Sequence, residues 1–498
     1  MNIYSLFRDR FPEPDDAVFI ETTAGQTFTY GDLDEQTSRL ADYLASLGLQ
    51  AGDRVAAQVD KSPYVLFVYL ACVRAGLIYL PLNPAYQPRE LDYLFGDAHP
   101  RIVVCSTARR DIVAGIADRH GIEQVFTLEA DGGGSLFASC SDMSTVQAVV
   151  ARDASDIAAL VYTSGTTGQP KGAMITHGNL AANGQTLHRA WGWSPNDVLL
   201  HALPLFHVHG LFVACHCVLL SGARMIFLEK PDTNAIVDHL PRATVLMGVP
   251  THYTRLLDNP RLDSSVCSGV RLFISGSAPL LEPTFTAFEQ RTGHTILERY
   301  GMTETGMNLS NPLHGPRIAG TVGSPLPGVS ARIVDDAGNA VQAGQVGSLE
   351  IKGPNVFSGY WRKPHKTLED FTKDKYFITG DLARENKNGY ISIVGRNTDM
   401  IISGGYNVYP KEVEQCIDML DGVRESAVIG VPDADFGEAV TAVVVAQRNT
   451  SVNSAAVIAR LKNELANYKV PKQVYVVEEL PRNAMGKVQK NVLRERYG

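Results

Sequence analysis

The alternation of strand-like and helix-like segments constrains the fold of this 498-residue chain more than any other feature. Residues 53–59 (DRVAAQV) and 77–81 (LIYLP) read as short strands, and residues 63–75 between them read as a helix. Strands that alternate with helices in this way indicate a mainly parallel α/β sheet. The pattern continues to about residue 320, and a chain of this length needs more than one domain.

The character of the sequence changes twice after residue 320. Residues 320–350 are rich in Gly, Val and Pro, which favours short antiparallel strands and turns. A further boundary falls after Arg396, and the residues beyond it, which include a helix predicted over 452–467, indicate a small α+β domain. We therefore expect an α/β protein with a large N-terminal domain, residues 1–396, made of parallel α/β subdomains and a small β-barrel-like portion. A small, mobile C-terminal domain, residues 397–498, would follow.

Bulk composition excludes several classes of protein. The formal net charge of −8 lacks the basic excess of a nucleic-acid-binding protein. Arg8, Asp9 and Arg10 interrupt the N-terminal residues, so these cannot form the apolar core of a signal peptide, and no apolar run is long enough to span a membrane. Seven scattered cysteines fit reduced thiols. We expect a cytoplasmic protein that binds neither nucleic acid nor membrane; its oligomeric state does not follow from the sequence.

The most informative segment is YTSGTTGQPKG, residues 162–172, which follows an apolar run at 157–161. Glycines let a backbone bend so that its N–H groups face a polyphosphate, hydroxyls add donors, and a lysine adds charge. The spacing is not Gly-x4-Gly-Lys-Ser/Thr, which weighs against a P-loop kinase or ATPase. A solvated Ser/Thr/Gly turn is the alternative.

TSGTTGQPKG resembles the signature of the adenylate-forming superfamily, which includes acyl-CoA synthetases, adenylation domains and firefly-type luciferases. Other segments match motifs of that family in the same order: SGSAP (275–279), YGMTE (300–304), TGD (379–381), GR (395–396) and residues 481–487. The resemblance implies an ATP-dependent acid–thiol ligase. Such an enzyme adenylates a carboxylic acid, releases pyrophosphate and passes the acyl group to coenzyme A.

The resemblance also implies a role for each motif residue. Catalytic roles fall to Lys487, Thr303 and Glu304, and Glu304 would also hold Mg²⁺, a hard cation that prefers oxygen ligands. The loop would hold the β- and γ-phosphates, the small residues after 275 and the strip 298–302 would frame the adenine, and Asp381 with Arg396 would hold the ribose. The implied ATP-binding residues are Thr163, Ser164, Gly165, Thr166, Thr167, Gly168, Lys171, Gly276, Ser277, Ala278, Glu298, Tyr300, Gly301, Met302, Asp381 and Arg396.

In this family the matching lysine bridges the substrate carboxylate and the α-phosphate, and it must then leave so that the thiol can enter. The resemblance implies a rotation of the small domain about a hinge near Thr398 and Asp399. Ser403, Gly404 and Gly405 would then approach the adenylate and form part of the tunnel for coenzyme A, where glycine keeps the wall thin. The basic tail, residues 469–498, is either a counter-surface for phosphates of coenzyme A or a solvated face.

Arg299 indicates which carboxylic acid is the substrate. It stands immediately before Tyr-Gly, where most family members carry a small residue, and a guanidinium there can bind a second carboxylate bidentately. The string ERYGMTET, with ATVLMGVP and PKEVE, resembles malonyl-CoA synthetases, so malonate is the implied substrate. His207 could add a polar contact, Val208 and Met307 could border the carbon between the carboxylates, and Arg255 is a weaker candidate. An ion pair of Arg299 with Glu298, or a phosphate-side role, is the alternative.

Other functions stay open at this stage. The acid could be another short one, such as methylmalonate, or the chain could be a stand-alone adenylation enzyme. Arg299 disfavours the aromatic pocket of a luciferase, and Glu304 with Lys487 weighs against a non-catalytic nucleotide-binding protein. The His and Cys residues of HVHGLFVACHC, 207–217, lack the paired spacings of zinc sites and indicate a buried helix entered through a pocket histidine.

Overall fold

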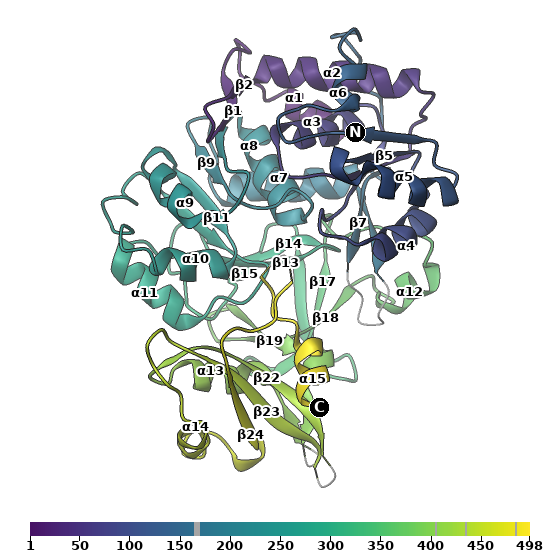
Figure 1. The fold of residues 1–498 in the computed structure, drawn as a ribbon. Helices are drawn as coiled ribbons and strands as arrows, with labels where there is room; N and C mark the ends of the chain where they lie inside the picture. Colours follow the sequence, from purple (N-terminus) through teal and green to yellow (C-terminus); the bar gives the residue numbers. More distant parts are fainter. Residues whose placement is uncertain (164–169, 404–405, 434–435, 484–485) are drawn as a thin grey trace.

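A computed structural model of the chain describes residues 1–163, 170–403, 406–433, 436–483 and 486–498 (Figure 1). Two mainly parallel sheets with their helices form the upper part of the molecule in this view, and the C-terminal strands and helices form a separate lower part. The structure confirms the predicted α/β class with a large N-terminal and a small C-terminal domain. No helix among the described residues is both long and apolar enough to cross a membrane.

The first parallel sheet has six strands, and only its last pair is antiparallel. Its strands, in spatial order, are β6 (Gln124–Thr127), β5 (Ile102–Cys105), β3 (Arg54–Gln58), β4 (Ile78–Pro81), β7 (Ile157–Thr163) and β8 (Lys171–Thr176). In the β7–β8 ladder Thr163 faces Lys171, so the ladder joins the two flanks of the predicted phosphate loop.

The second sheet has nine strands with a parallel centre and antiparallel edges. Its strands, in spatial order, are β15 (Ser324–Pro325), β14 (Gly306–Ser310), β13 (Leu297–Met302), β12 (Leu272–Ser275), β11 (Val245–Gly248), β9 (Val198–His201), β10 (Arg224–Phe227), β1 (Val18–Thr22) and β2 (Thr27–Thr29). Strand β13 runs parallel to β12 and then pairs antiparallel with β14. One strand therefore passes from the parallel centre of the sheet to its antiparallel edge.

A largely buried helix, α3, shows how local sequence and packing agree. Pro63 stands at the start of the helix and the side chain of Ser62 caps it by accepting from the N–H of Val65. Nearly every residue of α3 is buried, as expected for a helix that is apolar all round and lies in a core. Its residues belong to the largest hydrophobic cluster, which also contains residues from both parallel sheets.

The helices are α1 (Ile3–Arg8), α2 (Tyr30–Ser46), α3 (Pro63–Arg74), α4 (Pro88–Ala98), α5 (Arg110–Arg119), α6 (Ser135–Ser139), α7 (His177–Ala190), α8 (Cys215–Ser221), α9 (Thr233–His239), α10 (Pro250–Leu257), α11 (Glu282–Thr292), α12 (Pro364–Glu369), α13 (Pro410–Asp418), α14 (Ser454–Leu461) and α15 (Lys490–Tyr497). A buried π-helical segment, His209–Ala214, leads directly into α8, so the histidine- and cysteine-rich stretch is a buried helix as predicted.

Two further sheets complete the fold. An antiparallel sheet follows the change of composition after residue 320 and contains β16 (Ser330–Val334), β17 (Val346–Lys352), β18 (Phe377–Glu385) and β19 (Ile391–Arg396). The C-terminal sheet contains β21 (Tyr406–Val408), β20 (Ile401–Ser403), β23 (Gly437–Ala446), β22 (Val423–Asp433) and β24 (Gln473–Val477). The predicted domain boundary at residue 396 falls between β19 and β20 and stays a prediction.

The helix predicted over residues 452–467 is shorter than expected. Helix α14 covers only Ser454–Leu461, with the Asn453 side chain capping its first turn. Val457 and Leu461 are its buried anchors, and the helix ends just after the second of them. Asn463, a weak helix former, follows in a turn.

Candidate active site

The candidate site lies at the carboxyl ends of the central parallel strands of the nine-stranded sheet, the edge where α/β sheets place their ligands. Gly248 ends β11, Gly276 follows β12, and β13 carries residues 297–302. A cavity of about 740 Å³ lies between this edge and the C-terminal domain. Residues of both domains line it, and among them are Arg299, Tyr300, Asp381, Arg396 and Lys487.

Asp381 and Arg396 line this cavity as an ion pair. They face each other in the β18–β19 ladder, and Arg396 Nε lies 2.9 Å from Asp381 Oδ1. The Tyr300 hydroxyl donates to the other oxygen, Oδ2, at 2.5 Å. Asp381 raises the pKa of Arg396, and burial raises the pKa of Tyr300, so the phenol stays protonated and can donate. A carboxylate with two donors still has free lone pairs for the hydroxyls of a ribose.

Glu298 lies in the same cavity but contacts a different element. Its Oε1 accepts the N–H of Leu280 at 3.0 Å, and its buried Oε2 has no hydrogen-bond partner among the described residues. Burial raises the pKa of Glu298 to about 7. Ser277 adopts a left-handed backbone (φ 71°), and its hydroxyl lies 3.2 Å from His209 Nδ1. The predicted contacts of Gly276, Ser277, Ala278, Glu298, Gly301 and Met302 with adenine stay predictions.

Glu304, the predicted metal ligand, contacts Thr163 at one flank of the phosphate loop. Its Oε1 accepts from the Tyr360 hydroxyl at 3.2 Å and from Thr163 Oγ1 at 3.4 Å. Burial raises the pKa of Glu304, which means that the ionised carboxylate lacks water and gains from a cation nearby. Thr303 stands beside it, partly exposed. Tyr360 lies outside every motif recognised in the sequence, and nothing in the local pattern distinguished it.

The phosphate loop itself is only partly described. Thr163 and Lys171 are placed at the two ends of the loop, and Lys171 is buried. Ser164, Gly165, Thr166, Thr167 and Gly168, all predicted to bind phosphate, lie outside the described residues.

The loop that carries Lys487 projects from the C-terminal domain into the cavity. A Cβ atom added to Gly486 would lie 3.0 Å from the Thr251 hydroxyl of α10, so the loop packs closely on the N-terminal domain. Burial and the neighbouring Arg396 lower the pKa of Lys487. The structure thus brings Lys487 into the same cavity as Asp381 and Arg396, although Asp381 and Lys487 are 106 positions apart in the sequence (381 to 487).

Arg299 lies on the opposite face of β13 from Glu298 and Tyr300, because side chains alternate along a strand. It is 2% exposed. A Cβ atom at Gly276 would lie 2.4 Å from Arg299 Cζ, so the guanidinium rests on a backbone that only glycine leaves open. Among the described residues, Glu298 Oε2 and the Nε and Nη2 atoms of Arg299 have no hydrogen-bond partner, so these atoms do not pair with one another.

The guanidinium of Arg299 is buried without a partner for two of its donors. Nε and Nη2 make no hydrogen bond to any described residue. Burial lowers the pKa of Arg299 to about 9, so the group is charged at neutral pH. Burial and Arg299 lower the pKa of His207 to about 4, which leaves His207 neutral. A buried cation with unused donors is costly unless an anion occupies the site.

The other acyl-site candidates are placed less directly. Val208 and Met307 are both buried, and the terminal methyl of Met307 would lie 2.5 Å from a Cβ at Gly301. Arg255 is exposed near the end of α10, which begins at Pro250. The acyl roles of His207, Val208 and Met307 stay predictions.

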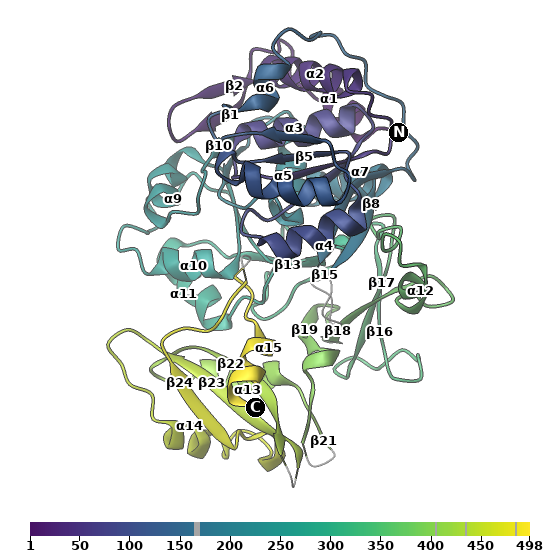
Figure 2. The same cartoon turned by 45° about the vertical axis from the view of Figure 1, so that its right-hand side comes forward.

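Of the residues predicted to meet coenzyme A, Ser403 does not line the cavity that contains Lys487. Ser403 ends β20 and is buried in the β20–β21 hairpin, and Gly404 and Gly405 lie outside the described residues. Figure 2 shows β21 at the end of the C-terminal domain that points away from the parallel sheets. Most of the basic tail is engaged: Lys469, Arg482, Lys490 and Arg494 pair with Glu412, Glu425, Glu414 and Asp399.

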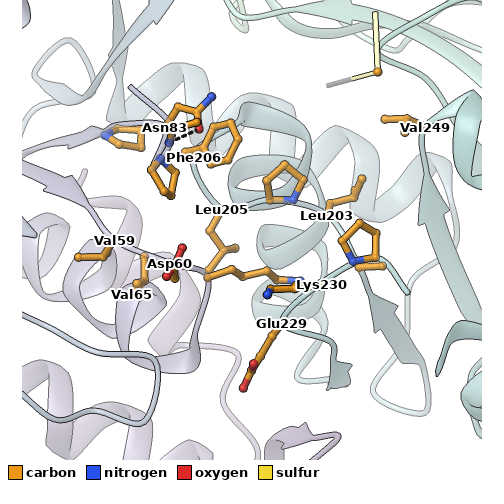
Figure 3. A pocket seen from close by; sticks show the side chains of 18 of the residues that line it. Val59, Asp60, Val65, Asn83, Leu203, Leu205, Phe206, Glu229, Lys230 and Val249 are labelled. Atoms are coloured by element: carbon orange, nitrogen blue, oxygen red, sulfur yellow. Dashed lines mark hydrogen bonds between the residues drawn. The ribbon is translucent and has the colours of Figure 1, made fainter. Parts of the chain in front are cut away.

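A second cavity of about 600 Å³, shown in Figure 3, shares part of its lining with the first. Val59, Asp60 and Val65 come from the region where α3 begins, and Leu203, Leu205 and Phe206 come from the segment after β9. The linings of the two cavities share Thr251, Arg255, Arg482 and Gly486. The two cavities therefore meet at α10 and at the loop that carries Lys487.

Comparisons with known families and proteins agree with this geometry. The profile of the AMP-binding enzyme family matches residues 7–361, and that of the AMP-binding enzyme C-terminal domain matches residues 412–487. Malonate–CoA ligase of Mus musculus, a mitochondrial protein, is 36% identical, covering 94% of this chain and 87% of its own length. Feruloyl-CoA synthase of Amycolatopsis sp is 35% identical, covering 95% of both chains.

Solved structures resemble the whole chain. ATP-bound MatB from Rhodopseudomonas palustris is 53% identical, with a TM-score of 0.97 over 100% of this chain and 98% of that chain. The apo structure of the same protein, at the same identity and coverage, gives a TM-score of 0.87. The arrangement described here is therefore closer to the ATP-bound form, which agrees with the presence of Lys487 in the cavity.

Proposed function

The chain belongs to the AMP-binding enzyme family, and from that premise we propose that it is a malonate–CoA ligase. The reaction forms malonyl-CoA, AMP and pyrophosphate from malonate, ATP and coenzyme A through a malonyl-adenylate. Relatives named malonate–CoA ligase, 34–36% identical across most of the chain, support the assignment.

The observation that carries the choice of acid is the buried, partly unpartnered guanidinium of Arg299. Overall identity does not separate the candidates, because a relative named feruloyl-CoA synthase is 35% identical. The aromatic ring of ferulate would pack against the guanidinium without accepting a hydrogen bond from it. The distal carboxylate of malonate can accept from Nε and Nη2 together. A ligase for another short dicarboxylate, such as methylmalonate, is the second candidate on the same observation.

The first half-reaction joins two anions, so the protein must offset charge and hold geometry. One carboxylate oxygen of malonate attacks the α-phosphorus of ATP, and the bond from that phosphorus to pyrophosphate breaks. Arg299 would hold the distal carboxylate, and Lys487 would lie between the reacting carboxylate and the α-phosphate. Asp381 and Arg396 would fix the ribose, and the loop ending at Lys171 would hold the outgoing phosphates.

Glu304 would hold Mg²⁺. Its carboxylate is buried and accepts hydrogen bonds from two neutral hydroxyls, those of Tyr360 and Thr163. Such a carboxylate fits a hard cation that prefers oxygen ligands. When bound, the ion offsets the charge of the phosphates.

The second half-reaction needs a path for the thiol. The sulfur of coenzyme A attacks the carbonyl carbon of the adenylate, AMP leaves, and the thiol proton passes to solvent. The smaller cavity offers an approach, but Arg482 and Gly486 of the Lys487 loop stand where the two cavities meet. We propose that the loop leaves by the predicted rotation near Asp399, after which Ser403–Gly405 approach the adenylate.

We also propose a cytoplasmic location, which the free state of all seven cysteines supports.

The test is an acid panel assayed by pyrophosphate release. We expect release that depends on malonate and on Mg²⁺, with acetate and ferulate much poorer, and malonyl-CoA as product when coenzyme A is added. Equal rates with malonate, acetate and ferulate would refute the dicarboxylate assignment. Release without thioester formation would instead indicate a stand-alone adenylation enzyme.

A further inference from the structure

Residues 358–361 (SGYW) form an extra edge beside strand β8. The N–H of Met174 donates to Gly359 O at 2.9 Å, and the N–H of Trp361 donates to Gly172 O at 2.8 Å. Gly359 has φ +128°, and a Cβ atom there would lie 2.6 Å from the Thr367 side chain. This backbone, which only glycine adopts easily, sets Tyr360 beside the strand that begins with Lys171.

Tyr360 contacts both the predicted metal ligand, Glu304, and the lysine of the phosphate loop, Lys171. Its side chain is 5% exposed, and its hydroxyl donates to Glu304 Oε1 at 3.2 Å. Thr163, the first residue of the loop, reaches the same oxygen. Lys171 Nζ lies 5.3 Å from the centroid of the Tyr360 ring, within the range of a cation–π contact. Since Thr163 and Lys171 face each other in the β7–β8 ladder, the phenol and the carboxylate together connect both flanks of the loop.

We propose that Tyr360 is a positioning residue that orients Glu304 toward the metal ion and holds Lys171 toward the phosphates. The inference rests on the proposed function for the roles of Glu304 and the loop. Both neutral side-chain donors reach Oε1, so neither of them occupies Oε2, the oxygen that would face a cation. A phenol serves here better than a lysine, because it fixes the carboxylate without cancelling the charge that attracts the metal.

The two contacts of Tyr360 can be separated by substitution. Tyr360→Phe removes the hydroxyl and keeps the ring under Lys171. We expect the affinity for Mn²⁺, used as a spectroscopic probe with saturating ATP and read by electron paramagnetic resonance, to fall about ten-fold. The Mg²⁺ concentration for half-maximal pyrophosphate release should rise by a similar factor, while the KM for malonate stays unchanged.

Tyr360→Leu removes both contacts and should show the same metal defect plus a raised KM for ATP, because Lys171 loses its support. Tyr30→Phe is the matched control. Tyr30 is fully buried, its hydroxyl donates to Ala223 O at 2.6 Å, and it lies outside the cavity, so its loss tests the general cost of a buried tyrosine hydroxyl. We expect wild-type metal dependence from this control.

Three outcomes decide the inference. Unchanged Mn²⁺ affinity in Tyr360→Phe, or an equal loss in Tyr30→Phe, overturns it. If Tyr360→Phe does not fold, Thr163→Val removes the second donor to the same oxygen and must weaken Mn²⁺ binding in the same direction. Because the Mn²⁺ measurement uses ATP alone, it still judges Tyr360 if malonate proves not to be the substrate, and failure of the malonate assay in the wild type refutes only the proposed function.

Discussion

Replacing Arg299 by methionine tests the proposed acid specificity most directly. Methionine keeps an unbranched stem of similar length, so the contact with Gly276 is largely preserved, while the charge and its donors are lost. The change therefore removes recognition of the distal carboxylate without opening a large cavity.

The size of the effect follows from the two unpartnered donors. Nε and Nη2 are each able to make a charge-assisted hydrogen bond to malonate, and such a bond contributes about 1.5–3 kcal/mol. Displacement of water from the free guanidinium offsets part of this, so we take about 3 kcal/mol for the pair, a factor of roughly 150 in kcat/KM. Because the distal carboxylate does not react, the loss should fall on KM more than on kcat.

The assay is pyrophosphate release with malonate and with acetate, each at saturating ATP and Mg²⁺. We expect the malonate kcat/KM to fall by about two orders of magnitude and the acetate value to stay within a few-fold. Arg255→Met is the matched control, since Arg255 lines the same cavity but is exposed, and it should change malonate kinetics little. A malonate value for Arg299→Met within about five-fold of wild type, or an equal loss with acetate, would show that Arg299 is structural.

Three further predictions follow from the geometry. Gly276→Ala places a methyl group against the guanidinium and should raise the malonate KM roughly ten- to hundred-fold; an unchanged KM would contradict the close contact. Lys487→Ala should abolish malonate-dependent pyrophosphate release yet still convert supplied malonyl-adenylate to thioester, and loss of both steps would contradict the rotation of the C-terminal domain. Burial lowers the pKa of His201 and His216 to about 3, so between about pH 6.5 and that value the unfolded chain binds protons that the folded chain does not. The free energy of unfolding should therefore fall as the pH drops from 7 to 5, by about 2 kcal/mol per histidine, and His216→Leu should shrink the fall measured by urea denaturation.

Family membership and the order of the motifs could be predicted from the sequence because they depend on local residue patterns. A glycine- and hydroxyl-rich loop after an apolar strand predicts a phosphate site wherever it occurs. Periodicity likewise predicted β3, α3 and β4 in order, since apolar spacing reflects which face of an element is buried. The exact end of α14 was not predictable from the sequence. The helix ends at Leu461, its last buried residue, and burial depends on tertiary packing.

The sequence by itself determined the residue types available for chemistry, including an arginine before Tyr300-Gly301 and a lysine after Gly486. Only the tertiary structure decided which of them meet. Arg299 and Glu298 are neighbours in the chain, yet the alternation of β13 sends them to opposite faces and leaves Nε and Nη2 of the guanidinium without a partner among the described residues. Tyr360 matches no recognised motif, yet pairing with β8 sets it against Glu304. Contacts between distant segments depend on which strands lie next to each other in a sheet, and a local residue pattern does not specify that order.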